Sequence, residues 1–231
     1  MPPKSLLSTA VLVFAYSPSE EMAHKHIPKA GALYTELTEQ TLRKIDKSGL
    51  SYFHFTEHEQ SGSTFGERFS NAIQFVFDHG FDNVITIGND TPLLTASHIQ
   101  RASICLDRGE FVMGPSTDGG FYLMGLHKSQ FHVDKFKNLP WQTNRTATAV
   151  LTVIRENKTK IVQLEILSDI DGIEDLKNIL KFKSKLTPQL AALIIFIIGQ
   201  EDPRIVFNLM GASQAFGQRI YNKGSPLLAV I

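Results

Sequence analysis

The chain has 231 residues, 42% of them apolar, which is enough for one substantial domain with a buried core. Lysine plus arginine equals aspartate plus glutamate, so the net charge is zero and the basic excess typical of nucleic-acid-binding proteins is missing. Cys105 is the only cysteine, which excludes an intramolecular disulfide and a cysteine zinc cluster and fits a reducing cytoplasm.

Apolar strands and amphipathic helices alternate along most of the sequence. The first apolar run, "AVLVFA", predicts a strand rather than a secretory signal. Strands are predicted at residues 10–15, 50–55, 83–88, 110–115, 120–126 and 160–166. Helices are predicted at residues 31–45, 67–79, 95–106 and 147–156. Strands without a polar face, alternating with helices, indicate an α/β fold with a mostly parallel sheet. The adjacent pair at 110–126, split by a Gly-rich turn, predicts one antiparallel strand and thus a mixed sheet.

A lysine-rich stretch, residues 177–188, suggests a boundary near residue 180. We therefore expect a main domain over residues 1–180 and a C-terminal helical appendage of two or three helices over residues 181–231. The apolar run at 190–199 is shorter than the roughly 20 residues of a membrane span and predicts a buried helix. These helices could instead form a homo-oligomer contact.

Asp90 follows the buried strand "NVITI" and precedes Thr91 and Pro92. Ligands of open α/β sheets bind at the carboxyl ends of strands, so Asp90 is a candidate ligand-binding acid. The alternative is an aspartate that caps a turn or a helix start.

Two further segments carry acids that could reach the same place. Asp118 precedes Gly119 and Gly120, which permit either a plain hairpin turn or a close approach of the backbone to a ligand. Asp169 and Asp171 are one residue apart in "SDIDGIEDL", a spacing that suits a hard divalent cation. The alternative for Asp171 is a helix N-cap with Glu174 in a capping box, and both hypotheses can hold together.

Taken in order, these segments resemble the bacterial DUF2064 proteins, a glycosyltransferase-like family with the nucleotide-diphospho-sugar transferase (GT-A) fold. The resemblance lies in "VLVFAYSP", "GSTFGERFSNA", "VITIGNDTPLLTASHI", "VMGPSTDGGFYLMGL", "LPWQTNRTA" and "SDIDGIEDL", which run in family order from about Val11 to Leu176. It implies a three-layer αβα, Rossmann-like architecture. Residues after Leu180 have no counterpart in it.

The resemblance also implies roles. Asp90, in "GNDTP", matches the acid that holds Mg²⁺ or Mn²⁺ at the end of the nucleotide-binding strand, and Asp171 matches a second metal or phosphate-side ligand. Asp118 matches a catalytic or acceptor-side acid. Trp141 would line the acceptor pocket, and Arg68 would contact an anion or form a structural ion pair. Together with these two, the implied ligand-binding positions are Phe14, Ala15, Lys25, Gly88, Gly119 and Gly120.

The chain departs from the family after its first strand. Members usually have a basic, Gly-containing loop like "FAKAPVPGRVKTRL", whereas this chain has "FAYSPSEEMAHKHI". Glu20 and Glu21 would repel a pyrophosphate, and His24 and His26 replace a lysine and an arginine. The two histidines are either solvated loop residues or a repurposed ligand or metal site. Lys25 remains as a cation in this segment.

Three hypotheses follow for the function. The first is a metal-dependent glycosyltransferase with a nucleotide-diphospho-sugar donor, impaired because the basic loop is eroded. The second is a nucleotidyltransferase on the same fold, and the third is a non-catalytic protein that binds a ligand or partner. The expected ligand is a nucleotide or nucleotide-sugar, with no nucleic acid and no membrane span. The donor, the acceptor and the stereochemical outcome are not encoded in any visible motif.

Overall fold

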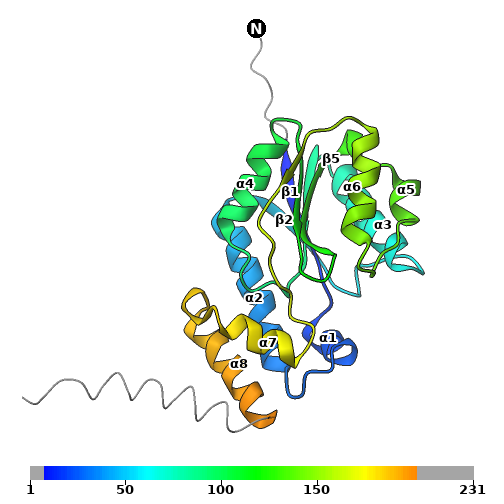
Figure 1. The fold of residues 1–231 in the computed structure, drawn as a ribbon. Coiled ribbons are helices and arrows are strands. Elements are labelled where there is room, and N and C mark those ends of the chain that lie inside the picture. The colour runs from blue at the N-terminus through cyan, green and yellow to red at the C-terminus, as the bar shows by residue number, and fades with distance from the viewer. Residues whose placement is uncertain (1–7, 202–231) are drawn as a thin grey trace, which may run out of the picture.

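The computed structural model describes residues 8–201, which fold into a six-stranded sheet between two layers of helices (Figure 1). The strands are β1 (Thr9–Phe14), β2 (Ser51–Phe55), β3 (Asn83–Ile87), β4 (Phe111–Pro115), β5 (Phe121–His127) and β6 (Ile161–Gln163). Their order in the sheet is β2-β1-β3-β5-β4-β6. Strand β5 is antiparallel to β3 and β4, and the other neighbours are parallel. The predicted mixed, mostly parallel sheet is confirmed.

Helices cover both faces of the sheet. In the described part of the chain they are α1 (Pro18–His24), α2 (Gly31–Ser48), α3 (Phe65–Asp78), α4 (Ala96–Leu106), α5 (Val133–Lys137), α6 (Thr146–Glu156), α7 (Ile173–Leu180) and α8 (Pro188–Glu201). Figure 1 shows α2 and α4 on one face and α3, α5 and α6 on the other. The three-layer αβα fold class is therefore confirmed. Helices α1 and α5 were not predicted, and β6 is shorter than expected.

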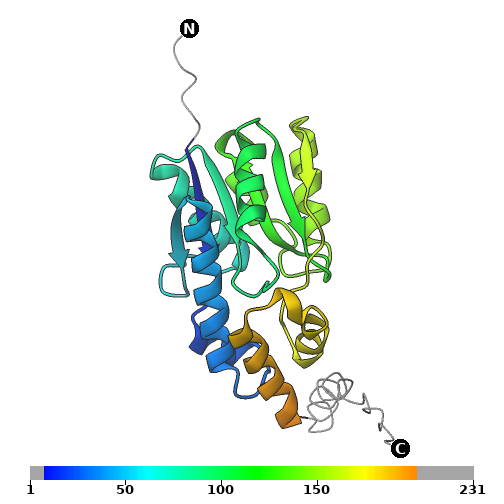
Figure 2. The same cartoon turned by 90° about the vertical axis from the view of Figure 1, so that its left-hand side faces the viewer.

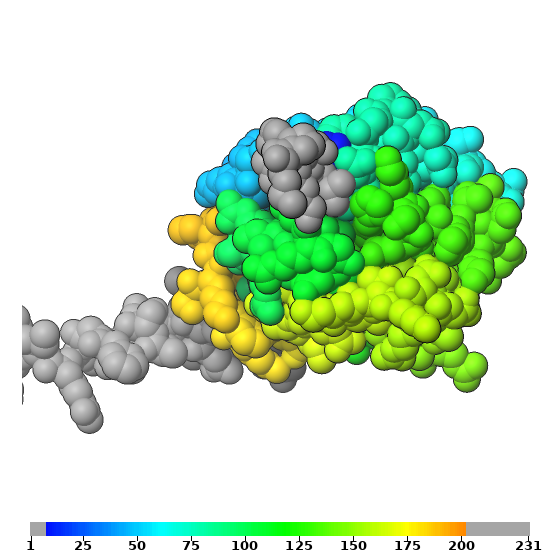
Figure 3. Space-filling view, turned by 90° about the horizontal axis from the view of Figure 1, so that it is seen from above, coloured from blue at the N-terminus to red at the C-terminus, as the bar shows by residue number. Residues whose placement is uncertain are grey.

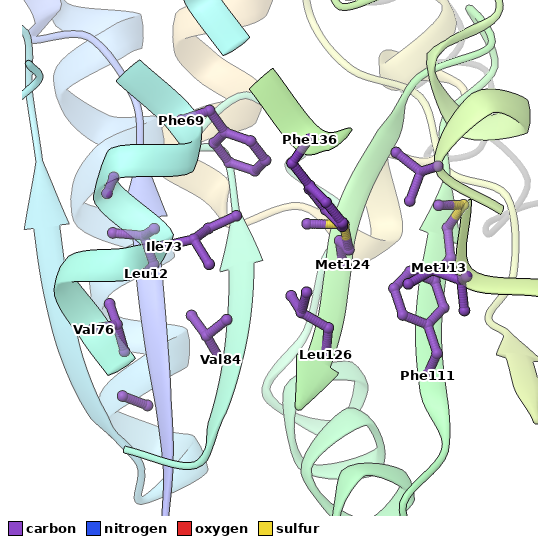
Figure 4. Close-up of a cluster of buried hydrophobic side chains, with 14 of the residues drawn as sticks. Leu12, Phe69, Ile73, Val76, Val84, Phe111, Met113, Met124, Leu126 and Phe136 are labelled. Atoms are coloured by element: carbon purple, nitrogen blue, oxygen red, sulfur yellow. The ribbon is translucent and has the colours of Figure 1, made fainter. Parts of the chain in front are cut away.

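The core on the α3 side joins five adjacent strands, β2-β1-β3-β5-β4, to the helices α3, α5 and α6, and Figure 4 shows part of it. Helix α3 contributes Phe69, Ile73 and Val76, the face that its apolar spacing predicts. Burying each such side chain stabilises the fold by about 1.5–3 kcal/mol. These side chains and their neighbours fix the helix against the sheet; the labelled members of the cluster are Leu12, Phe69, Ile73, Val76, Val84, Phe111, Met113, Met124, Leu126 and Phe136.

A separate core lies beyond the edge of the sheet, where the first half of α2 packs against α7 and α8 (Figure 2). Leu33 and Leu37 of α2 are buried here with Ile179 of α7 and Ile194 of α8. The predicted boundary at residue 180 falls directly after α7. The predicted helices beyond residue 201 lie outside the described residues. Among the helices that the structure describes, none is long and apolar enough to cross a membrane.

The parallel strands place their carboxyl ends at one edge of the sheet, the edge near α1 and α7 in Figure 1. Because β5 runs the other way, the β4–β5 turn also lies at this edge. Figure 3 views the molecule from the opposite end, near the start of β1. All the acids singled out from the sequence belong to segments that leave the sheet at the carboxyl edge.

Candidate functional site

The segment after β1 forms a short helix, α1, instead of the expected open loop. Ser17 is its N-cap and accepts a hydrogen bond from the Glu20 backbone N–H, and Pro18 occupies the first helical position. Glu57, in the loop after β2, accepts hydrogen bonds from the Ser17 backbone N–H and hydroxyl, both at 2.8 Å. The helix ends at His24, and the next residue is Lys25. Lys25 is the only lysine or arginine between β1 and residue 28, and its side chain lines the cleft described below.

Asp90 leaves the end of β3 as the sequence predicts. Its carboxylate Oδ2 lies 2.6 Å from the Lys25 ammonium Nζ. Its backbone carbonyl accepts a hydrogen bond from the Ile170 N–H at 3.0 Å. These two contacts join the loop after β3 to α1 on one side and to the segment after β6 on the other.

Asp118 lies in the β4–β5 turn, where its Oδ1 accepts hydrogen bonds from the Ser116 hydroxyl and from the Gly120 N–H, the latter at 2.9 Å. Gly119 has a φ of +92°. A Cβ on Gly119 would lie 2.3 Å from the Asn144 carbonyl oxygen, so only glycine fits this turn. The turn therefore holds one Asp118 oxygen and leaves Oδ2 directed to no described protein donor.

The two acids after β6 have different environments. Asp169 accepts a hydrogen bond from the Thr91 hydroxyl at 2.5 Å, whereas the exposed Asp171 has Oδ1 at 3.0 Å from Lys25 Nζ. Asp171 is not the N-cap of α7, because the cap is Gly172 and the Asp175 carboxylate accepts the free backbone N–H groups. The capping hypothesis for Asp171 was wrong by one residue, and its carboxylate remains available to the cleft.

The structure brings the predicted acids together in one cleft. A cavity of about 480 Å³ is lined by Asp90, Asp118, Asp169 and Asp171. The aromatic residues Phe14, Phe65, Phe69, Phe121 and Trp141 also line it. We call this space the carboxylate cavity.

A second cavity of about 480 Å³ adjoins the first and shares Asp90 and Gly88 with it. Its walls carry both cations of the cleft, Lys25 and Arg68, together with the carboxylate of Glu21 and with Ala15 after β1. We call this space the basic cavity. Every predicted ligand-binding residue lines one of the two cavities except Gly119, which packs against Asn144 instead.

Trp141 is fixed by its indole N–H, which donates to the Phe136 carbonyl at 2.6 Å. Its ring packs edge-on against Phe69, with 5.1 Å between the centroids, and lies near Phe65 and Phe121. Because the polar N–H is already bonded, the indole offers the carboxylate cavity an apolar face. Such a rigid aromatic wall suits the ring of a sugar or base.

Arg68 and Lys25 differ in how they are neutralised. The Arg68 guanidinium donates to the Gln60 side chain at 3.2 Å and to the Tyr16 hydroxyl at 3.4 Å. No carboxylate among the described residues lies within ion-pair distance of it, so the predicted structural ion pair of Arg68 is not formed. Its charge is therefore free to face an anion in the basic cavity.

Lys25 is surrounded by acids. Its ammonium contacts Asp90 and Asp171 and lies 3.7 Å from Glu21 Oε2. Burial opposes its charge, but the three carboxylates raise the pKa of Lys25 well above its ordinary value, with Asp90 acting most strongly. The side chain is therefore a permanent cation at the meeting point of the two cavities.

Asp169 shows the opposite effect. Burial and, after it, the negative charge of Asp90 raise the pKa of Asp169 to about 7. The cleft thus holds more carboxylate than its two cations neutralise. A cationic or hydroxyl-bearing ligand group would relieve this excess.

The predicted Mg²⁺ or Mn²⁺ site does not fit this arrangement. Asp90 and Asp171, the two expected ligands, both bind the Lys25 ammonium. Within residues 8–201, no group of three or more histidine, cysteine or carboxylate side chains is placed to hold a metal ion. The histidines offer no alternative site, because His26 is exposed and His24 stacks on Tyr16 and contacts Glu20.

Comparison with protein families gives one match. A model described as "Uncharacterized protein conserved in bacteria (DUF2064)" matches residues 28–143, half of the chain. Asp90, Asp118 and Trp141 lie inside the matched range, whereas Lys25 and Asp171 lie outside it. No curated protein matches the sequence.

Comparison with solved structures supports the fold. A protein from Desulfovibrio desulfuricans G20, provisionally named a nucleotide-diphospho-sugar transferase, has a TM-score of 0.69 and 22% identity; the similarity covers 84% of this chain and 97% of that one. A cytidylyltransferase from Leptospira borgpetersenii has a TM-score of 0.45 and 16% identity, covering 94% and 100%. A manganese complex of Rv0371c from Mycobacterium tuberculosis H37Rv has a TM-score of 0.46 and 11% identity, covering 76% and 98%. Only the first similarity is close enough to establish the fold, and none establishes a ligand.

Proposed function

Because the chain belongs to the DUF2064 family and has the fold of a nucleotide-diphospho-sugar transferase, we propose that it transfers a sugar from a nucleotide-diphospho-sugar to an acceptor hydroxyl. The observation that carries the proposal is the pair of adjoining cavities at the carboxyl edge of the sheet, one lined by both cations, Lys25 and Arg68, and the other rich in carboxylates. Fold alone would not decide the chemistry, since the same fold can serve different reactions.

The basic cavity is the proposed site of the donor diphosphate. Arg68 has no carboxylate partner among the described residues and supplies a planar set of donors that suits phosphate oxygens. Strand β1 ends here at Phe14, and Phe14 and Ala15 line the cavity. The leaving nucleoside diphosphate gains negative charge as its bond to the sugar breaks, and a fixed cation nearby stabilises that charge.

The carboxylate cavity is the proposed site of the transferred sugar and the acceptor. Asp118 is held at Oδ1 by two donors, so Oδ2 is positioned to accept a proton from an acceptor hydroxyl. In the proposed step, the acceptor oxygen bonds to the anomeric carbon while the bond from that carbon to the diphosphate breaks. Trp141 and the neighbouring phenylalanines would exclude water and stack on a sugar ring.

The first experiment measures binding and transfer separately. Thermal shift and calorimetry with UDP-, GDP-, ADP- and CDP-sugars should find one nucleotide class that stabilises the protein. Asp118→Asn should keep that binding and lower kcat by roughly 100-fold or more, as expected for loss of a general base. Asp107→Asn, an exposed acid at the end of α4, is the matched control and should change neither quantity.

The outcomes separate the hypotheses. Release of pyrophosphate from a nucleoside triphosphate supplied with a sugar phosphate, without any sugar transfer from the nucleotide-sugars, would indicate a nucleotidyltransferase. Binding of a nucleotide without any product would indicate a non-catalytic binding protein. If no nucleotide or nucleotide-sugar binds at millimolar concentration, the proposal is wrong.

A further inference from the structure

The Lys25 ammonium lies in a cradle of three oxygens. It is 2.6 Å from Asp90 Oδ2, 2.8 Å from the Ile170 carbonyl oxygen and 3.0 Å from Asp171 Oδ1. An ammonium group has three N–H donors, so each can be directed to one oxygen. The Lys25 side chain is only 15% exposed, so its ammonium is largely shielded from water although Asp171 is not.

The oxygens of this cradle are of the kind that bind a hard divalent cation. Two carboxylates and one carbonyl would together be a suitable partial ligand set for Mg²⁺ or Mn²⁺. The Lys25 nitrogen, however, is farther from these oxygens than Mg²⁺ is from its ligands, which is about 2.0–2.1 Å. All three distances to the Lys25 nitrogen are those of hydrogen bonds to an ammonium.

The backbone holds Lys25 firmly in position. Its N–H donates to the Glu21 carbonyl at 2.8 Å and closes helix α1, and its carbonyl accepts from the Ile27 N–H at 2.9 Å. Ile27 is buried in the core that α2 shares with α7 and α8. The Lys25 backbone is therefore fixed, and the three oxygen contacts hold the ammonium at the end of the side chain.

We propose that the Lys25 ammonium is the resident cation of this cleft and takes the place of a divalent metal ion between Asp90 and Asp171. Lys25 then acts as a positioning residue that neutralises two acids and joins the loops after β3 and β6. The inference rests on the proposed function in one respect: the donor diphosphate, which approaches through the basic cavity, would need no Mg²⁺ or Mn²⁺ to offset these acids. Its direct contact would be Arg68.

The test uses Mn²⁺ alone, measured by electron paramagnetic resonance and calorimetry on the full chain. The wild-type protein should bind no stoichiometric Mn²⁺. Lys25→Met leaves the cradle without a cation and should raise Mn²⁺ affinity by roughly tenfold or more, the scale on which neighbours of a metal site change its affinity. Lys25→Met combined with Asp90→Asn should lose the gain. Lys29→Met, an exposed lysine in the same segment, should behave as wild type.

Stoichiometric Mn²⁺ binding by the wild-type protein that Asp90→Asn abolishes would overturn the inference. Unchanged Mn²⁺ affinity in a folded Lys25→Met variant would also overturn it. Should that variant not fold, the wild-type measurement and Lys25→Arg, which keeps the charge and should bind no Mn²⁺, decide the matter.

A second measurement compares nucleotide-sugar binding with EDTA and with Mn²⁺: equal affinity supports the inference, and affinity that appears only with Mn²⁺ contradicts it. Absence of nucleotide binding in both media would contradict the proposed function and leave the Mn²⁺ result to stand by itself.

Discussion

Two half-buried lysines contact the loop after β3, and their surroundings shift their pKa values in opposite directions. Lys25 reaches the Asp90 carboxylate in this loop and is surrounded by three acids. Lys44, from the middle of α2, donates to the Pro92 carbonyl at 3.0 Å and has no carboxylate within ion-pair distance in the described part of the chain. Burial, with a smaller contribution from Arg43, lowers the pKa of Lys44 to about 8, whereas the pKa of Lys25 is raised.

The comparison shows that burial alone does not determine the pKa of a lysine. Both side chains lose water, and loss of water disfavours an ammonium. The acids around Lys25 more than offset that loss, while a single carbonyl does not offset it for Lys44. Lys25 lines the cleft and Lys44 lines neither cavity, which is the distribution expected if the paired charge serves the ligand site.

The largest expected effect is that of removing the paired ammonium. Lys25→Met leaves Glu21, Asp90 and Asp171 close together without a cation. Breaking a buried ion pair typically costs about 3–5 kcal/mol, but Asp171 is 58% exposed, so we expect about 2–3 kcal/mol lower stability. Urea denaturation at pH 7 in EDTA measures it. Lys29→Met should change stability by less than about 0.5 kcal/mol, and a similar value for Lys25→Met would remove the distinction between the two lysines.

Removing the unpaired ammonium should have the opposite sign. The pKa of Lys44 is about 8 in the folded chain and 10.5 ordinarily, so between these pH values the unfolded chain binds more protons and stability rises with pH. Below pH 8 the full penalty of the buried charge is present. Lys44→Met should therefore stabilise the protein by about 1–2 kcal/mol at pH 7. Denaturation curves from pH 7 to 10.5 should show the difference from wild type fading as pH rises; a constant difference would contradict the assignment.

The smallest effect concerns the outermost acid around Lys25. Burial, opposed by Lys25, raises the pKa of Glu21, so its carboxylate lowers stability as pH rises above the ordinary value of 4.5. Glu21 is 3.7 Å from Lys25 and makes a weaker contact than Asp90 does. Glu21→Gln should stabilise the protein slightly at pH 7, by up to about 1 kcal/mol, and have no effect near pH 4. Destabilisation at pH 7 would show that all three acids are needed to hold the ammonium.

Much of the sheet could be predicted from local patterns. The five residues of β3 are all buried, so its largely apolar run of Val84, Ile85 and Ile87 was informative, and Asp90 followed from the end of that run. Helix α3 was predicted because Phe69, Ile73 and Val76 recur at helical spacing. The position of Asp118 also followed, since the Gly-rich turn between two strands admits few other geometries.

The Lys25 contacts could not be predicted in the same way. Helix α1 has only seven residues and no apolar periodicity, and the sequence "SEEMAH" was taken for a loop. The available signal was local: Ser17 followed by Pro18 is a favourable helix start. Lys25 pairs with Asp90 and Asp171, which are 65 and 146 positions away along the chain. A single sequence contains no information about such distant pairing. The burial that shifts Asp169 is likewise a property of the assembled cleft.

The core shared by α2, α7 and α8 connects the last described helix to the segment that carries Lys25. Ile27, two residues after Lys25, is packed with Ile194 and Ile198 of α8. A protein truncated before α8 would therefore expose Ile27 and lose part of the core that supports the segment carrying Lys25. Helix α8 thus supports the position of Lys25, and substitutions in α8 should alter ligand binding in the cleft.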